Sequence, residues 1–139
     1  MSGTKPIFEI FEEVRAAEDK VAALKPYENN AVLRTILRGI FDPQVKFLLP
    51  EGPLPDTFKP NVFDFESKTF LYNQAKRFYL FIEGGHPTLT EKKRQELFID
   101  LCEGIHPKDV EILVAMKDKK SPVEGLTKRI VLKAFPELF

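Results

Sequence analysis

The chain has 139 residues, of which 43% are hydrophobic and 30% charged, and its 21 Lys and Arg residues balance its 21 Asp and Glu residues. This length and composition favour one folded domain over residues 1–139 and exclude two independent domains or a disordered chain. The longest apolar runs span about five residues, whereas a helix that crosses a membrane needs about 20.

The first part of the chain predicts two helices, each with one apolar face. Apolar side chains recur at helical spacing over residues 7–24, which predicts a single helix that Pro26 ends. Asn29 or Asn30 can cap a second helix, whose apolar stripe runs from Val32 to Phe41. This second helix carries basic residues on the side opposite its apolar stripe.

A short helix and a proline-rich connection are expected next. Asp42 and Pro43 are typical of a helix start, which predicts a short helix over residues 44–48. Residues 50–60 contain Gly52 and four prolines, namely Pro50, Pro53, Pro55 and Pro60. This composition excludes a regular helix or strand and predicts a stiff, extended strap across the domain.

The middle of the chain predicts a long, central helix over residues 65–82, followed by a capped one. The expected inward residues of the central helix are Phe65, Leu71, Tyr72, Ala75, Phe78, Tyr79 and Ile82. Thr88 and Glu91 form a capping-box pattern that predicts the start of the next helix, which ends at Gly104.

Two further helices are predicted before the chain ends. Pro107 opens the first, with apolar side chains inward, and the second runs from about residue 124 to 134. No stretch alternates at the two-residue period of a strand. The sequence therefore predicts an all-α, single-domain bundle of six or seven helices with a proline-rich strap.

Motifs for catalysis, cofactors or metals are missing from the sequence. It contains no glycine-rich phosphate loop and no dinucleotide fingerprint. His86 and His106 precede prolines at turns, and Cys102 falls on an inward helix face, so we expect no metal site and no nucleophile. The single cysteine and the lack of a visible secretory signal favour the cytoplasm.

Three stretches near the C-terminus carry a resemblance. Residues 106–118 read His-Pro-Lys-Asp-Val-Glu-Ile-Leu-Val-Ala-Met-Lys-Asp, residues 125–130 read Gly-Leu-Thr-Lys-Arg-Ile, and residues 133–138 read Lys-Ala-Phe-Pro-Glu-Leu. They resemble the end of the N-terminal DNA-binding domain of tailed-phage ATP-dependent DNA ligases. Residues 30–50 are similar to that domain's second helix and the proline-rich passage after it. The likeness runs in order from about residue 7 to 138.

The resemblance implies a free-standing DNA-binding module, encoded by a phage and acting in the cytoplasm of an infected bacterium. The chain lacks the Lys-x-Asp-Gly nucleophile of the ligases, and it ends at Phe139, where a ligase continues into its nucleotidyltransferase domain. We therefore expect no enzymatic activity and no cofactor. The turn at residues 119–124 is about three residues longer than the family's, so the geometry of DNA contact is expected to differ.

Positive charge gathers in two segments of this neutral chain. Residues 31–50 hold three basic and one acidic residue, and residues 116–139 hold six and three. Gly125 is expected to start the last helix, where free backbone amides and a threonine hydroxyl suit a phosphate. The expected contacts with the backbone of double-stranded DNA, made with little sequence preference, are Arg34, Arg38, Lys46, Lys117, Lys119, Lys120, Gly125, Thr127, Lys128 and Arg129.

Two alternatives stay open at this level. The same charges are typical of a solubilising surface, because a protein that binds DNA without sequence preference is usually basic as a whole. Zero net charge and 12% aromatic residues also fit an adaptor that holds a phage or host protein. The DNA hypothesis requires the helix with Arg34 and Arg38 to lie beside the last helix.

Overall fold

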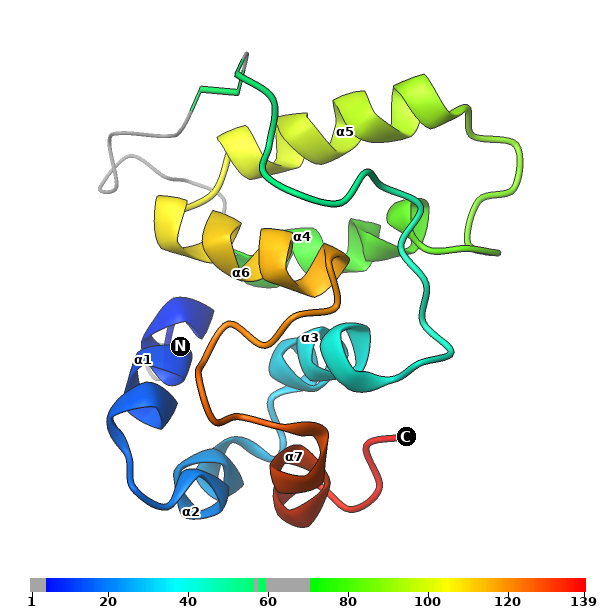
Figure 1. The fold of residues 1–139 in the computed structure, drawn as a ribbon. Helices are drawn as coiled ribbons and strands as arrows, with labels where there is room; N and C mark the ends of the chain where they lie inside the picture. Colours follow the sequence, from blue (N-terminus) through cyan, green and yellow to red (C-terminus); the bar gives the residue numbers. More distant parts are fainter. Residues whose placement is uncertain (1–4, 57, 60–70) are drawn as a thin grey trace.

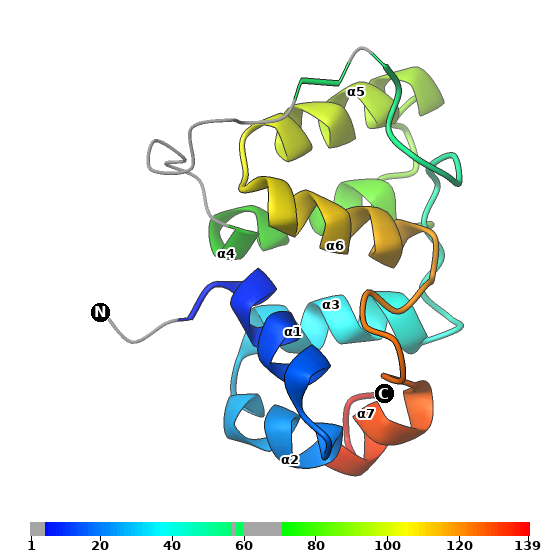
Figure 2. The ribbon, with the colours of Figure 1, turned by 60° about the vertical axis from the view of Figure 1, so that its left-hand side comes forward.

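The computed structural model describes residues 5–56, 58–59 and 71–139, and in these ranges the chain is a bundle of helices without a sheet (Figure 1). The all-α prediction is therefore confirmed. The helices stack in layers from α5 at one end, through α6 and α4, then α1 and α3, to α2 and α7 at the other end (Figure 2). The α-helices are α1 Ile7–Ala16, α2 Lys20–Leu24, α3 Ala31–Phe41, α4 Leu71–Gln74, α5 Glu91–Glu103, α6 Pro107–Lys117 and α7 Lys128–Ala134.

The single helix predicted over residues 7–24 is wrong, because the chain breaks between α1 and α2. Asp19 accepts a hydrogen bond from the backbone of Ala22 at 3.0 Å and so caps a new helix. Lys20 donates from Nζ to the carbonyls of Val14 and Ala17, each at 3.0 Å. The helix dipole favours a cation at the end of α1, so these hydrogen bonds stabilise the break.

The prediction for α3 is confirmed, but the short helix over residues 44–48 is wrong. Asn30 caps α3 by accepting from the backbone of Leu33 at 3.1 Å. Asp42 instead accepts from the backbone of Gln44 at 2.9 Å, which holds a turn. Phe47 then forms an isolated antiparallel bridge with Ile82, so extended pairing replaces the helix.

The helix predicted over residues 65–82 differs from the structure in its described part. Residues 60–70, and with them Phe65, lie outside the described residues. After α4 the chain continues as a 3₁₀ helix, η3, over Ala75–Phe81, in which Phe78 and Phe81 are buried and Tyr79 is 52% exposed. A 3₁₀ helix has three residues per turn, so positions three apart share a face, and Tyr79 turns away from the core.

The last three helices differ from the predictions mainly in where they begin. Thr90, and not Thr88, caps α5 by accepting from the backbone of Lys93 at 3.2 Å. Pro107 opens α6 as predicted, with His106 as its N-cap. The last helix starts later than predicted, after Thr127.

The core runs through the whole bundle between the helix layers. Its buried members come from every layer and include Phe11 of α1, Leu37 of α3, Leu113 of α6 and Val131 of α7. Cys102 also belongs to it, as predicted, and burial raises its thiol pKa to about 12.

In the described part of the chain no helix has the length and apolar character needed to span a bilayer.

Candidate nucleic-acid interface

Two arginines lie one turn apart on α3, on the side that turns toward the C-terminal residues. The guanidinium of Arg34 donates to the carbonyl of Glu28 at 3.1 Å and lies 5.6 Å from the ring centroid of Phe135. Arg38 is exposed and has no hydrogen bond or ion pair with the described residues. Positions four apart share one face of a helix, so both arginines lie on the same side of α3.

Helix α7 brings a second pair of cations close to this face. Lys128 and Arg129 are exposed in its first turn, and Nζ of Lys128 lies 5.4 Å from the ring centroid of Phe139. Both views place α7 beside α3 (Figures 1 and 2). Phe135, which Arg34 contacts, is only four residues from Phe139, so the two ring-bearing Cα atoms are at most about 14 Å apart.

The predicted phosphate site at Gly125 differs from the structure. Gly125 adopts a φ of +85° within a turn and does not start a helix, and the amide of Leu126 is taken by the carbonyl of Val123 at 3.1 Å. The hydroxyl of Thr127 accepts from the backbone of Ile130 at 3.4 Å as the cap of α7. The backbone cradle expected at Gly125 is therefore not formed.

Lys117 is a buried structural residue, which contradicts its prediction as a phosphate contact. Its ammonium donates to the carbonyls of Pro50 at 2.8 Å and Gly52 at 2.7 Å, and it forms an ion pair with Asp118 at 2.7 Å. The Asp118 carboxylate in turn accepts from the backbone of Gly52. Lys117 and Asp118 thus anchor the start of the strap, and no donor of the ammonium is left for a ligand.

Lys119 is also occupied inside the protein, which contradicts its predicted role. Its Nζ donates to the carbonyls of Gly39, Asp42 and Val45 at 2.5, 2.7 and 2.8 Å. These carbonyls lie at and just beyond the end of α3, where a cation is favoured by the helix dipole. Burial lowers the pKa of Lys119, and the charge of Asp42 opposes that change. The backbone of Lys119 has a φ of +59°, which turns the chain back from α6 toward α3.

Lys46 and Lys120 are exposed, and their contacts are with the residue after η3 and with the strap. Nζ of Lys120 is 3.8 Å from Glu51, and both side chains are exposed, so the pair contributes little. The carbonyl of Lys46 accepts from the backbone of Glu83 at 2.8 Å, which holds it next to η3. Of the predicted contacts, Arg34 and Lys128 lie over two rings of the same C-terminal segment. We call these two residues, together with Arg38 of α3 and Arg129 of α7, the basic face.

The aromatic partners of the basic face were not among the predicted site residues. Phe135 is buried and Phe139 is 41% exposed. A cation over a ring gains from the ring's negative face, and the contact also orients the cation. The sequence does show two phenylalanines four residues apart after α7. It does not show which cations contact them, because that depends on the fold.

Other chemistry is limited in the described residues. They contain no cluster of three or more His, Cys, Asp or Glu that could hold a metal ion. Asp109 of α6 is buried, its Oδ1 has no hydrogen-bond partner, and the backbone N–H of Phe8 at the start of α1 donates to its carboxylate. Burial raises the pKa of Asp109 to about 7, and this hydrogen bond partly offsets the rise.

Comparison with known protein families finds a match over most of the chain. Residues 7–122 match the model of a family described as a family of unknown function (DUF6433). The match runs from α1 to the turn before α7 and leaves α7 outside it. No curated protein and no solved structure matches the chain.

Proposed function

The chain belongs to the DUF6433 family, whose function is unknown, and we propose that it is a non-enzymatic module that binds the backbone of double-stranded DNA with little sequence preference. The basic face is the proposed contact surface. The proposal keeps four of the predicted contacts. It gives up Lys117 and Lys119, whose donors are used inside the protein, the turn at Gly125 and Thr127, and the exposed Lys46 and Lys120. It agrees with the resemblance to the DNA-binding domain of phage ligases.

One observation carries the proposal: residues 135–139 contact cations of both α3 and α7. Arg34 lies over Phe135 and Lys128 over Phe139, so one short segment holds the two strips together. None of the four cations of the basic face forms an ion pair with a described carboxylate. Cations without an ion-pair partner can attract phosphates even when the net charge of the chain is zero.

The chemistry of the face favours backbone contact over base reading. Arg34 and Lys128 are held against rings, and Arg38 and Arg129 are free to donate to phosphate oxygens. Contacts to phosphates fix a protein on the duplex but carry no sequence information. Binding is therefore expected to be similar for duplexes of different sequence.

Charge reversal on α7 tests the proposal. Changing Lys128→Glu and Arg129→Glu together should weaken binding to a labelled duplex at least about tenfold, since each lost charged hydrogen bond costs about 1.5 kcal/mol or more. Glu is favourable in the first turn of a helix, so α7 should stay folded. Fluorescence anisotropy at low salt measures the affinity, and circular dichroism checks the helical content.

A matched control separates the basic face from general charge. Lys92→Glu with Lys93→Glu makes the same change in net charge in the first turn of α5, where both side chains are exposed. This variant should bind the duplex nearly as well as the unchanged protein. Equal losses in the two variants, or no binding by the unchanged protein at low salt, would remove the proposal.

A further inference from the structure

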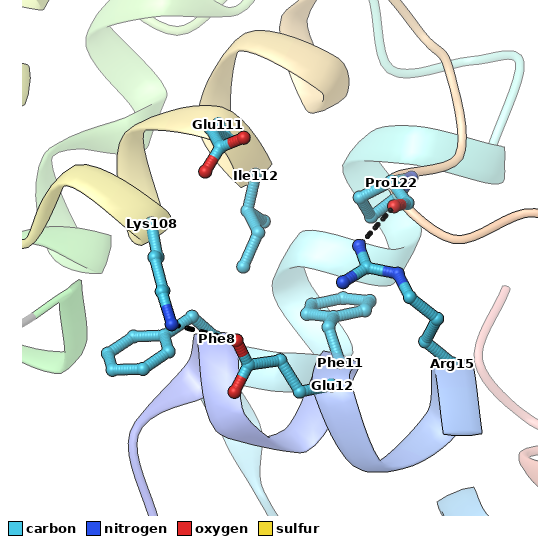
Figure 3. Close-up of a pocket in the computed structure, with 8 residues that line it drawn as sticks. All are labelled: Phe8, Phe11, Glu12, Arg15, Lys108, Glu111, Ile112 and Pro122. Atoms are coloured by element: carbon cyan, nitrogen blue, oxygen red, sulfur yellow. Dashed lines mark hydrogen bonds and ion pairs between the residues drawn. The ribbon is translucent and has the colours of Figure 1, made fainter. Parts of the chain in front are cut away.

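A hollow of about 380 Å³ lies between α1 and α6, on residues that the basic face does not use (Figure 3). Phe8 and Phe11 come from α1, Ile112 comes from α6, and Pro122 closes one end. These residues give the hollow an apolar floor, and its volume is in the range of sites that hold a small ligand or a side chain.

One half of its rim is already neutralised within the protein. Nζ of Lys108 forms an ion pair with Glu12 at 3.1 Å and lies 5.5 Å from the ring centroid of Phe8. This pair links α6 to α1 across one end of the hollow (Figure 3). The two charges compensate one another there, so this end offers a ligand little net charge.

The other charged residues on the rim have unused bonding capacity. Nη2 of Arg15 donates to the carbonyl of Pro122 at 3.1 Å, and the rest of the guanidinium has no further partner in the described residues. Glu111 is exposed and has no hydrogen bond or ion pair with the described residues. The hollow therefore presents one available cation and one available carboxylate around an apolar floor (Figure 3).

We infer that this hollow binds a peptide segment of a partner protein that carries an apolar side chain between an acidic and a basic residue. The apolar side chain covers the floor, the ligand carboxylate meets Arg15, and the ligand cation meets Glu111. A guanidinium binds carboxylates well because its donors form a planar fork. A nucleic acid fits less well, since the unpaired carboxylate of Glu111 would face its phosphates.

A titration with short peptides tests the inference on the full chain. The probes are acetylated and amidated tripeptides of sequence Asp-Leu-Lys and Lys-Leu-Asp, with Asn-Leu-Gln as the neutral control. In ¹⁵N-labelled protein, at least one charged peptide should shift the backbone amide signals of Arg15, Glu111 and Ile112. The neutral peptide lacks both charged contacts and should bind at least about tenfold more weakly, because the loss of one hydrogen bond to a charged group already costs about that much.

Two variants link the binding to the rim. Arg15→Gln and Glu111→Gln should each weaken the better peptide about tenfold, whereas Lys93→Gln on α5 should leave it unchanged. Glu111 has no partner to lose, so its variant stays informative even if Arg15→Gln disturbs the fold. The inference is overturned if no peptide shifts these signals, if the neutral peptide binds equally well, or if duplex DNA shifts them instead. DNA binding through α3 and α7 can fail or succeed independently.

Discussion

The carboxyl group of Asp109 is enclosed between α6 and the start of α1, where water cannot solvate its charge. Pro6 precedes α1 and offers it no side-chain cap, so the hydrogen bond between Asp109 and the amide of Phe8 takes that place. A negative charge is favoured there by the helix dipole, but burial opposes the charge more strongly. The residue therefore couples the contact between two helices to its own protonation.

This coupling predicts how stability depends on pH. The pKa of Asp109 is about 7 in the folded chain against 3.8 for an ordinary Asp, so the folded state holds a proton that the unfolded state has lost between these values. The stability that this bound proton contributes is fully present below about pH 4 and is lost as the pH rises through 7. Asp109→Asn removes this titration. As the pH rises from 5 to 8, the free energy of unfolding of the variant should therefore increase by about 2–3 kcal/mol relative to that of the unchanged protein.

Urea unfolding at several pH values measures this difference. Asp100→Asn, at an exposed position of α5, removes a carboxylate without touching the α1–α6 contact. Its stability should follow that of the unchanged protein across the same range. A constant difference between Asp109→Asn and the unchanged protein would show that Asp109 is already ionised at pH 5.

At the scale of elements, the strap is held by a buried ion pair and not by regular structure. The side chains of Lys117 and Asp118 are 3% and 8% exposed, and together they bind the backbone of Pro50 and Gly52. Leu54 and Pro55 then line a second hollow, of about 210 Å³, with Phe98 and Ile99 of α5. The end of α6 thereby fixes where the strap begins to cross α5.

Breaking this anchor should destabilise the protein. Lys117→Met leaves the Asp118 carboxylate buried and unpaired, and the free energy of unfolding should fall by about 3–5 kcal/mol. Adding Asp118→Asn removes the unpaired charge and should restore part of the loss. Chemical unfolding measures both variants, and hydrogen exchange at the Gly52 amide reports the strap itself. Equal stability of the single and double variants would contradict this account.

The helices that sequence reasoning located best are those whose ends are set by neighbouring residues. Asn30 and Pro107 mark the starts of α3 and α6, because a cap or a proline acts within one turn. The break after α1 depends on Lys20 reaching back to the carbonyl of Val14, and the apolar periodicity over 7–24 does not reveal it. In η3 the apolar spacing fits both three and 3.6 residues per turn, so the pattern could not separate the two helix types.

The candidate site was predictable only where lysines and arginines stay on the surface. Lys117, Lys119 and Lys128 read alike in the sequence, as basic residues close to the last helix. Whether such a side chain finds carbonyl partners depends on the distant segments at Pro50 and Gly39, which only the folded chain brings near. The internal use of two lysines leaves α3 and α7 as the source of the basic face.

At the scale of the whole molecule, zero net charge makes the salt dependence of DNA binding the most direct measure of the basic face. Four phosphate contacts predict a slope of log affinity against log salt of about −3.6, at about −0.9 per contact. The double change Lys128→Glu and Arg129→Glu should reduce that slope by about 1.8, and the Lys92 and Lys93 control should not alter it. Anisotropy titrations between about 50 and 200 mM salt give both slopes. A slope near zero would mean that the contact with DNA is not through phosphates.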